Sequence, residues 1–472
     1  MSHTKIIATI GPETTSKDAL RELILAGVNV CRLNFSHGDH EQHRQSIENI
    51  IDLNQELRTN VTILADLQGP KLRIGDVEND QILLIDGNTV ELVAQECIST
   101  SKRLYVSYAD LAKDIKCGET VLIDDGKIKL EVVETNKKDT VTAKIIHGGL
   151  VTSKKGINLP NTSLTSPSFT EKDLIDATFA LDYNVDWIAL SFVRSAEDLI
   201  PLRDLCRSKR KFTRIVAKIE KPEAIENIDE IIDISNGIMI ARGDLGVEVP
   251  FDHVPILQKM IVKKCIERAK PVIIATQMLD SMVYSFRPTR AEANDVANAV
   301  LDGADALMLS TETAIGSYPA ESVKAMRQII SWTLKNGFRF NLKNLPDPES
   351  HTFLPDSICY NACRMANQAK AKAIVVFTFS GYTALRISSH RPLAETFVFT
   401  RNKALVRKMP LIWGAHAYHS EETNNIDEAI EHSIINLKER GYIKTGDVIV
   451  HVGSTPFDEK GQTNMIKLSY VN

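Results

Sequence analysis

The sequence lacks several features that would assign it to other classes of protein. It has no dense run of lysine and arginine, and the net charge of its 472 residues is only −5, so we expect no nucleic-acid partner. No apolar run is long enough to span a bilayer, and the chain does not open on a signal-peptide pattern. We therefore expect no membrane association.

Cysteine pairs are also missing. The seven cysteines, at positions 31, 97, 117, 206, 265, 359 and 363, form no CxxC motif. A scattered, odd-numbered set is typical of reduced thiols rather than of a disulfide framework. We therefore expect a cytoplasmic protein.

What the chain does have is a regular alternation of strand-like and helix-like segments. Short apolar runs, each followed by a stretch of helical periodicity, occur at residues 6–10, 28–33, 61–66, 186–191, 214–219, 237–241, 271–275 and 306–309. Apolar strands of this kind indicate a parallel sheet covered on both faces, and eight units favour a closed (β/α)₈ TIM barrel. The alternative is an open doubly wound sheet, but its usual Gly-rich turn is absent after Thr9-Ile10-Gly11-Pro12.

The barrel pattern is interrupted once and is followed by a second unit. Residues 71–153 change to strand-like alternation, with hairpin signals at Asp86-Gly87 and Asp125-Gly126. They predict an inserted small β-barrel domain, either a lid over the barrel mouth or a passive decoration. The catalytic barrel would then comprise residues 1–70 and 154–343. A proline-rich linker over 344–355 would lead to an open α/β domain over 356–472.

Polar side chains stand at the ends of most predicted barrel strands, where TIM barrels carry their chemistry. The third strand ends at Asp66, and the other strand ends supply Arg32, Lys218, Glu220, Arg242, Asp244, Thr276, Gln277, Ser310, Thr311, Glu312 and Thr313. Any single one of these residues is better explained as a surface or ion-pair residue. Together they indicate that a ligand or a metal compensates their charges.

Glu220 and Asp244 follow adjacent strands without a nearby cysteine or histidine. Two carboxylates alone suit Mg²⁺ or Mn²⁺, which take further ligands from water and substrate. The alternative is that they form ion pairs with Arg32 and Arg242. Lys218 lies on the same face of its strand as Glu220, and a lysine beside a divalent ion indicates an anionic substrate such as a phosphoryl group in transfer. Residues 242–246 follow a strand and precede a predicted helix, a position that favours anion binding.

On these motifs the sequence resembles the pyruvate kinase family, whose members move a phosphoryl group from phosphoenolpyruvate to ADP. The matching segments are residues 32–38, 215–225, 241–246, 275–278, 287–300 and 312–313. The resemblance covers the whole chain in the family's order of barrel, inserted domain, barrel and C-terminal domain. It implies an allosteric homotetramer that carries out the last step of glycolysis.

The resemblance also implies roles for individual residues. Glu220 and Asp244 would hold the divalent ion, Lys218 would stabilise the phosphoryl group in the transition state, and Arg32 would contact the phosphate. Gly243, Asp244 and Thr276 would bind the substrate carboxylate. A relay that protonates the enolate would consist of Thr276, Ser310, Glu312 and water. The nucleotide would be bound by Asn34, His37, Arg73 and Lys155.

One departure from the family concerns the monovalent ion. Many members need K⁺ and carry Asp-Thr-Lys-Gly-Pro-Glu where this chain has Asp66-Leu67-Gln68-Gly69-Pro70-Lys71. The family's K⁺ site would be formed by Asn34, Ser36, Asp66 and Leu67. Leu67 lacks a hydroxyl ligand and the Lys71 ammonium would stand in for the ion, so we predict that K⁺ is dispensable. The alternative is that Lys71 only forms an ion pair with a nearby carboxylate.

In the C-terminal domain, residues 378–383 lie between a predicted strand and a predicted helix. Their hydroxyls, glycine and helix start are typical of a phosphate cradle, formed by Thr378, Ser380, Gly381 and Thr383. The segment resembles the family's allosteric loop, except that Tyr382 replaces the usual arginine. The variant at 68–71 is typical of bacterial members that respond to sugar monophosphates or AMP. An ordinary turn is the alternative, and the sequence does not identify the effector.

Two other functions compete with this hypothesis. A mutase or aldolase acting on phosphoenolpyruvate or a 2-oxo acid would not need a lid and a regulatory domain. A catalytically silent relative that only binds nucleotide or sugar phosphate would have no reason to keep Lys218, Glu220 and Asp244. The sequence therefore favours a kinase that produces pyruvate and ATP.

Overall fold

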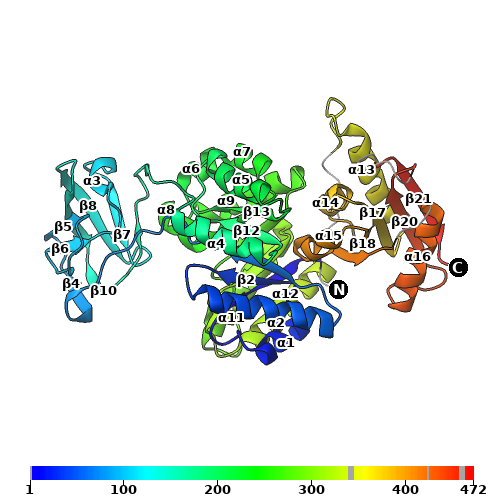
Figure 1. The fold of residues 1–472 in the computed structure, drawn as a ribbon, viewed down its shortest axis with the longest axis horizontal. Coiled ribbons are helices and arrows are strands. Elements are labelled where there is room, and N and C mark those ends of the chain that lie inside the picture. Colours follow the sequence, from blue (N-terminus) through cyan, green and yellow to red (C-terminus); the bar gives the residue numbers. More distant parts are fainter. Residues whose placement is uncertain (1–2, 338–344, 422–424, 457–462) are drawn as a thin grey trace.

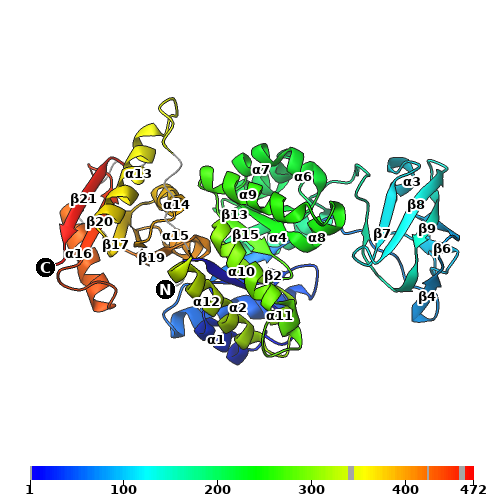
Figure 2. The same cartoon turned by 180° about the vertical axis from the view of Figure 1, so that it is seen from behind.

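The computed structural model describes residues 3–337, 345–421, 425–456 and 463–472. Three domains lie in a row (Figures 1 and 2): an inserted sheet domain at one end, a barrel in the middle and a C-terminal α/β domain at the other end. The end of the predicted barrel segment, 338–343, and the first residue of the predicted linker, Asn344, lie outside the described residues. No helix in the described part of the chain is both long and apolar enough to cross a membrane.

Eight parallel strands close into a barrel, which confirms the predicted TIM barrel. The strand order around it is β1-β16-β15-β14-β13-β12-β3-β2. The strands are β1 Lys5–Ile10, β2 Val30–Asn34, β3 Thr62–Asp66, β12 Trp187–Leu190, β13 Arg214–Ile219, β14 Gly237–Ala241, β15 Val272–Ala275 and β16 Ala306–Leu309.

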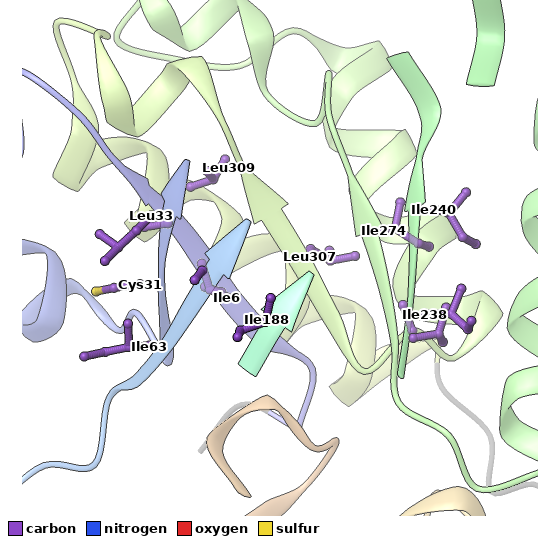
Figure 3. Close-up of a cluster of buried hydrophobic side chains, with 14 of the residues drawn as sticks. Ile6, Cys31, Leu33, Ile63, Ile188, Ile238, Ile240, Ile274, Leu307 and Leu309 are labelled. Carbon is purple, nitrogen blue, oxygen red and sulfur yellow. The ribbon is translucent and has the colours of Figure 1, made fainter. Parts of the chain in front are cut away.

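Residue alternation along these strands separates two apolar layers. Side chains such as Ile6, Leu33 and Ile240 point outward and pack under the surrounding helices (Figure 3). Those of Val30 and Val216 belong to the layer inside the barrel. Alternate residues of a strand share a face. Because Val30 and Val216 point into the barrel, Arg32 on β2 and Lys218 on β13, each two residues further along, also point inward.

The helices around the barrel are α1 Lys17–Ala26, α2 His40–Glu56, α4 Glu171–Asp182, α5 Ile200–Ser208, α9 Val254–Glu267, α10 Arg290–Asp302 and α12 Pro319–Asn336. Side chains of Ser16, Asp39, Thr170 and Thr289 cap α1, α2, α4 and α10. Residues 223–235 have helical periodicity but form two helices, α6 Pro222–Glu226 and α7 Ile228–Ile234. The break falls at Asn227, whose side-chain amide donates to the Arg194 carbonyl at 3.0 Å.

The inserted domain is built from strands, as predicted, but its main sheet includes residues 157–158, beyond the predicted end of the domain at residue 153. Its six-stranded sheet has the order β11-β7-β8-β9-β5-β6, and β4 pairs with β10 in a second sheet. The bounds are β4 Gln81–Leu84, β5 Thr89–Val93, β6 Arg103–Tyr105, β7 Thr120–Ile123, β8 Ile128–Thr135, β9 Thr140–His147, β10 Gly149–Thr152 and β11 Ile157–Asn158. Of the sheets in the described residues, only the central barrel closes on itself.

The C-terminal domain is an open sheet with the order β19-β18-β17-β20-β21, in which β21 is the antiparallel edge strand. Its elements are α13 Phe353–Gln368, β17 Ala373–Phe377, α14 Tyr382–Ser389, β18 Glu395–Thr400, α15 Lys403–Lys408, β19 Ala415–His419, α16 Ile426–Glu439, β20 Val448–Gly453 and β21 Met465–Tyr470. It packs against the amino-terminal ends of the barrel strands, where Arg391 pairs with Asp305 at 2.7 Å and the Lys5 ammonium donates to the Ala415 carbonyl at 3.0 Å. The opposite face of the barrel carries the candidate site.

Candidate active site

The centre of the site is a buried polar cluster at the carboxyl ends of the barrel strands. The Lys218 ammonium lies 3.2 Å from Asp66 Oδ1 and 3.0 Å from Glu220 Oε1. It donates to Ser191 Oγ at 2.7 Å, and Ser191 donates to the Leu67 carbonyl at 2.7 Å. Three neighbouring strands therefore hold one cation among two carboxylates and a hydroxyl.

Burial and mutual attraction compete in this cluster. Burial would lower the pKa of Lys218, but Asp66 and Glu220 outweigh it and raise that pKa. Burial disfavours the charge of Asp66, yet Lys218 and Arg32 lower its pKa. For Glu220, burial together with nearby Asp244 prevails over Lys218, and the pKa is raised. A second cation beside Glu220 would therefore stabilise the ionised form of its carboxylate.

The two arginines do not pair with the predicted metal ligands. Arg32 Nε donates to Asp66 Oδ2 at 2.7 Å, and its Nη1 donates to Thr9 Oγ1 at 3.0 Å. The Arg242 guanidinium lies 2.8 Å from each oxygen of Asp295 and donates to the Thr276 carbonyl at 2.9 Å. The alternative in which Arg32 and Arg242 neutralise Glu220 and Asp244 is therefore not observed.

Asp244 lies in the first turn of α8, Arg242–Glu248. The sequence predicted that residues 242–246 precede a helix, and the structure shows that they form one. The reason is tertiary: the Arg242 contacts described above and the bond from Gly243 N–H to Thr276 Oγ1, at 2.7 Å, hold a segment whose glycines have weak helix propensity. Thr276 and Gln277 both have positive φ, 70° and 54°, a strained backbone of the kind found at functional sites.

The residues present fit a hard divalent cation. Among the described residues, the Asp244 carboxylate has no hydrogen bond or ion pair, and Glu220 Oε1 is buried with only the Lys218 ammonium beside it. The described chain contains no group of three or more histidine, cysteine or carboxylate side chains placed to hold a metal. Two oxygen ligands alone favour an ion that completes its shell with water and substrate.

The predicted proton relay is only partly assembled by direct contacts. Glu312 is buried, and its two oxygens accept from the backbone N–H groups of Leu279 at 3.0 Å and Ser310 at 2.7 Å. Burial raises the pKa of Glu312. Ser310 Oγ is buried and has no partner in the described residues, whereas Thr276 Oγ1 donates to the Ala275 carbonyl at 2.6 Å. Glu312 thus orients the backbone of Ser310, and the serine hydroxyl is left available.

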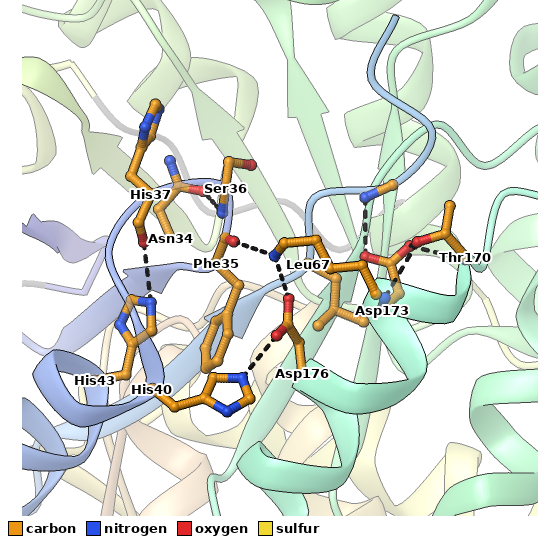
Figure 4. A network of polar contacts seen from close by, with 12 residues as sticks. Asn34, Phe35, Ser36, His37, His40, His43, Leu67, Thr170, Asp173 and Asp176 are labelled. Atoms are coloured by element: carbon orange, nitrogen blue, oxygen red, sulfur yellow. Dashed lines mark hydrogen bonds and ion pairs between the residues drawn. The ribbon is translucent and has the colours of Figure 1, made fainter. Parts of the chain in front are cut away.

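The loops that follow β2 and β3 are held together by α4 (Figure 4). Lys172 donates to the Phe35 carbonyl at 2.8 Å and pairs with Asp176 at 2.5 Å. Asp173 accepts from the Gly69 N–H at 3.0 Å. In the first loop, Asn34 Oδ1 accepts from the Ser36 N–H at 3.1 Å, and the His37 carbonyl accepts from His43 at 3.1 Å. The candidate K⁺ residues therefore sit in two loops with a common anchor.

Three cationic side chains lie at the base of the inserted domain. Arg73 donates to the Lys154 carbonyl at 2.9 Å, and Lys155 pairs with Asp124 at 2.9 Å. Lys71 is exposed, and no carboxylate of the described residues lies within ion-pair distance of it. Burial, followed by Lys71 and Arg73, lowers the pKa of His37, so these charges act on the loop that carries Asn34 and Ser36.

The predicted effector loop closes on itself in the C-terminal domain. Thr378 Oγ1 accepts from the Gly381 N–H at 3.1 Å, and Ser380 Oγ accepts from the Tyr382 N–H at 3.3 Å. Gly381 has a φ of 88° at the N-cap of α14. Thr383 Oγ1 lies 2.7 Å from Thr463 Oγ1. The Tyr382 hydroxyl donates to Asp356 at 2.6 Å, so this side chain is held against α13.

Sequence reasoning missed several residues that shape the site. Ser191, which contacts the Lys218 ammonium, follows directly after β12 and could have been found as a further polar strand end. Asp295 and Asp173 lie on helices, and only the fold brings them to the strand ends. Asp295 falls within the matching segment 287–300, but the sequence does not indicate its contact with Arg242.

Comparison with known proteins gives a consistent result over the whole chain. Residues 1–323 match the family model "Pyruvate kinase, barrel domain", and residues 356–469 match "Pyruvate kinase, alpha/beta domain". The pyruvate kinase of Geobacillus stearothermophilus is 41% identical over 99% of this chain and 80% of its own length. That of Clostridium acetobutylicum is 40% identical over the full length of both chains. A crystal structure of a pyruvate kinase from Cryptosporidium parvum superimposes with a TM-score of 0.93 at 34% identity, covering 100% of this chain and 96% of the other.

Proposed function

The chain belongs to the pyruvate kinase family, and from this premise we propose that its residues divide the phosphoryl transfer from phosphoenolpyruvate to ADP as follows. The bond between phosphorus and the enolate oxygen breaks, a bond to the terminal phosphate oxygen of ADP forms, and the enolate takes up a proton to give pyruvate. Lys218 and Arg32 stabilise the charge on the phosphoryl oxygens in transit. The observation that carries this proposal is the buried Lys218 ammonium between Asp66 and Glu220.

Glu220 and Asp244 would hold Mg²⁺ or Mn²⁺, which supplies Lewis-acid stabilisation of the substrate oxygens when bound. The Gly243 and Asp244 amides and the Thr276 hydroxyl bind the substrate carboxylate. This requires the Gly243 N–H to exchange Thr276 Oγ1 for the carboxylate. The Ser310 hydroxyl, available in the structure, then relays a proton from solvent water to the enolate carbon, accepting one proton as it releases another, with Glu312 fixing its position.

The nucleotide phosphates meet the cationic side chains at the base of the inserted domain, Arg73 and Lys155, together with Asn34 and His37. Arg73 and Lys155 lie at the two hinges of the inserted domain, so rotation of this domain would bring the nucleotide toward Lys218. The four residues at the family's K⁺ site would be Asn34, Ser36, Asp66 and Leu67. The Lys71 ammonium takes the place of the K⁺ ion at this site. This exposed ammonium, free of carboxylate partners in the described residues, supports this assignment over a simple ion pair.

A phosphorylated effector, a sugar monophosphate or AMP, would bind at Thr378, Ser380, Gly381 and Thr383. The amide-rich turn at the start of α14 supports an anion there. Tyr382 occupies the position of the family's usual arginine, and its hydroxyl is hydrogen-bonded to Asp356.

The enzyme would act as a homotetramer in the cytoplasm. Large exposed apolar side chains support an interface on the barrel: Tyr284, Phe286 and Ile315 are 85%, 59% and 55% exposed. All seven cysteines are free. Light scattering at micromolar concentration should give four times the chain mass of 52.5 kDa, and a monomer would contradict this assignment.

The decisive experiment is a pyruvate-forming assay with phosphoenolpyruvate, ADP and Mg²⁺, run with and without K⁺ and with a panel of sugar phosphates and AMP. We expect ADP-dependent pyruvate formation that needs the divalent ion. Release of pyruvate without ADP would point instead to a different phosphoenolpyruvate enzyme. A protein that binds the nucleotide but forms no pyruvate would be a catalytically silent relative.

A further inference from the structure

A second buried ion pair lies beside the metal ligands and takes no part in the reaction described above. The Lys221 ammonium is 3.0 Å from Glu248 Oε1, and the two side chains are only 6% and 1% exposed. Glu248 Oε1 also accepts from the Asn158 side-chain amide at 2.9 Å. Asn158 belongs to β11, at the return from the inserted domain to the barrel.

The positions of this pair follow the two metal ligands closely. Lys221 is the residue after Glu220, and Glu248 lies four residues after Asp244 on α8. Residues four apart are neighbours on a helix surface, so α8 presents two carboxylates to the same side. Asp244, Glu248 and Lys221 line one cleft together with Asn158.

The same cleft is also lined by Lys71, Arg194 and Asp125. Asp244 and Glu248 are its two carboxylates on α8. In the structure the Lys221 ammonium pairs with Glu248, while Asp244 has no hydrogen bond or ion pair among the described residues. A buried cation requires a partner. Without the charge of Glu248, the Lys221 ammonium would need another partner, and Asp244, one helical turn away from Glu248 on α8 and in the same cleft, carries a carboxylate with no ion pair in the described residues. There the ammonium would compete with a divalent ion.

We propose that Glu248 is a positioning residue that holds the Lys221 ammonium away from Asp244 and so keeps Asp244 available to the divalent ion. This inference rests on the proposed assignment of Glu220 and Asp244 as the metal ligands. It predicts that the charge of Glu248, rather than its shape, sets the affinity for the metal.

The test is the binding of Mn²⁺ to the full-length enzyme without substrates, measured from the electron paramagnetic resonance signal of the free ion. Glu248→Gln, which keeps the shape and the contact with Asn158, should weaken Mn²⁺ binding at least tenfold. The double variant Glu248→Gln with Lys221→Met should return the affinity to within about threefold of the parent. Lys264→Met, which breaks a surface pair with Asp229, is the control for charge and should have no effect.

Each result decides the proposal. Unchanged Mn²⁺ affinity in Glu248→Gln overturns it, and so does a double variant that binds as weakly as the single one, because the freed lysine would then not be the cause. If the single variant fails to fold, the double variant and Lys221→Met, which contain no unpaired buried ammonium, must still bind Mn²⁺ to within about threefold. Asp244→Asn separates the two hypotheses: if it leaves Mn²⁺ binding intact, the proposed metal site itself is wrong.

Discussion

Lys218 shows how one residue can be both buried and charged. Its ammonium is compensated by Asp66, Glu220 and the Ser191 hydroxyl, so its charge is retained at neutral pH and its position is fixed. A phosphoryl group entering the site meets a cation that needs no reorientation, which is the condition for strong electrostatic stabilisation of a transition state.

The first prediction concerns this residue. Lys218→Ala should lower kcat by well over tenfold, a loss of more than about 1.4 kcal/mol of transition-state stabilisation, because Lys218 is the only lysine of the described residues that pairs with Asp66 and Glu220. Steady-state pyruvate formation measures it, with circular dichroism to confirm folding and Lys264→Ala as a surface control. Turnover within tenfold of the parent would disprove the proposed role.

The second prediction concerns Lys71. Replacing a tetraalkylammonium salt by KCl should change the turnover of the parent by less than about twofold, because the ammonium already supplies a monovalent charge. Lys71→Glu should make turnover depend on K⁺ many-fold, and Lys71→Met should lose activity in both salts. A parent enzyme whose turnover rises many-fold with K⁺ would show that Lys71 does not replace the ion.

At the scale of elements, short segments held by tertiary contacts carry much of the site. Helix α8 has only seven residues and two glycines, so isolated propensity would not maintain it. Arg242 fixes its start through Asp295, and Glu248 fixes its end through Lys221. The turn at the start of α14 depends in a similar way on Gly381, which adopts a backbone conformation that favours glycine.

The third prediction concerns that turn. In Gly381→Ala, the new Cβ would stand 2.8 Å from Leu405 Cδ1 and 3.2 Å from Arg214 Nη2 at a φ of 88°, so the backbone of the loop is strained and the Leu405 side chain or the loop must shift. The effector concentration for half-maximal activation should rise at least tenfold, while basal activity stays near that of the parent because the loop lies on the far side of the barrel from Lys218. Titration of activity with the sugar phosphates and AMP measures both.

Gly441→Ala is the matched control. Gly441 also has a positive φ, 73°, but its added Cβ would meet no atom within 4 Å. It carries the backbone strain without the clash, so its effector response should remain that of the parent. Equal effector responses in both variants would remove the loop from the effector site.

At the scale of the whole molecule, we expect three buried histidines to make the C-terminal domain sensitive to acid. Burial lowers the pKa of His390, His416 and His451, each to about 4, and all three belong to the C-terminal domain. An unfolded histidine has a pKa near 6.5. Between pH 6.5 and 4 the unfolded chain therefore binds more protons than the folded one, and the free energy of unfolding falls as the pH falls.

The fourth prediction follows from this difference. The thermal midpoint of the C-terminal domain should drop steadily between pH 6.5 and 4.5, and calorimetry should show this transition separating from that of the barrel. His451→Leu, which removes one buried titrating group, should make the drop shallower, whereas His253→Gln at an exposed position should not. A C-terminal transition that is independent of pH over this range would contradict the prediction.

Much of this architecture could be predicted from the sequence because the signals are local. The alternation of apolar runs and amphipathic segments predicted the eight barrel strands within a few residues, and the strand ends supplied Lys218, Glu220, Asp244 and Arg32. Both predictions depend only on residues close together in the sequence. The periodicity of apolar residues indicates which positions are buried, and a polar residue directly after a buried strand lies at the mouth of the barrel.

Only the tertiary structure decided how those residues are paired. Arg242 was a candidate ion-pair partner for Glu220 and Asp244, but in the folded chain it pairs with Asp295 on α10 instead. Lys221 lies in the matching segment 215–225, and the fold pairs it with Glu248 and leaves Asp244 free of protein partners in the described chain. The sequence determined which charges this protein brings to the mouth of its barrel. Which charge meets which depends on distances between segments far apart in the chain, and only packing sets those distances.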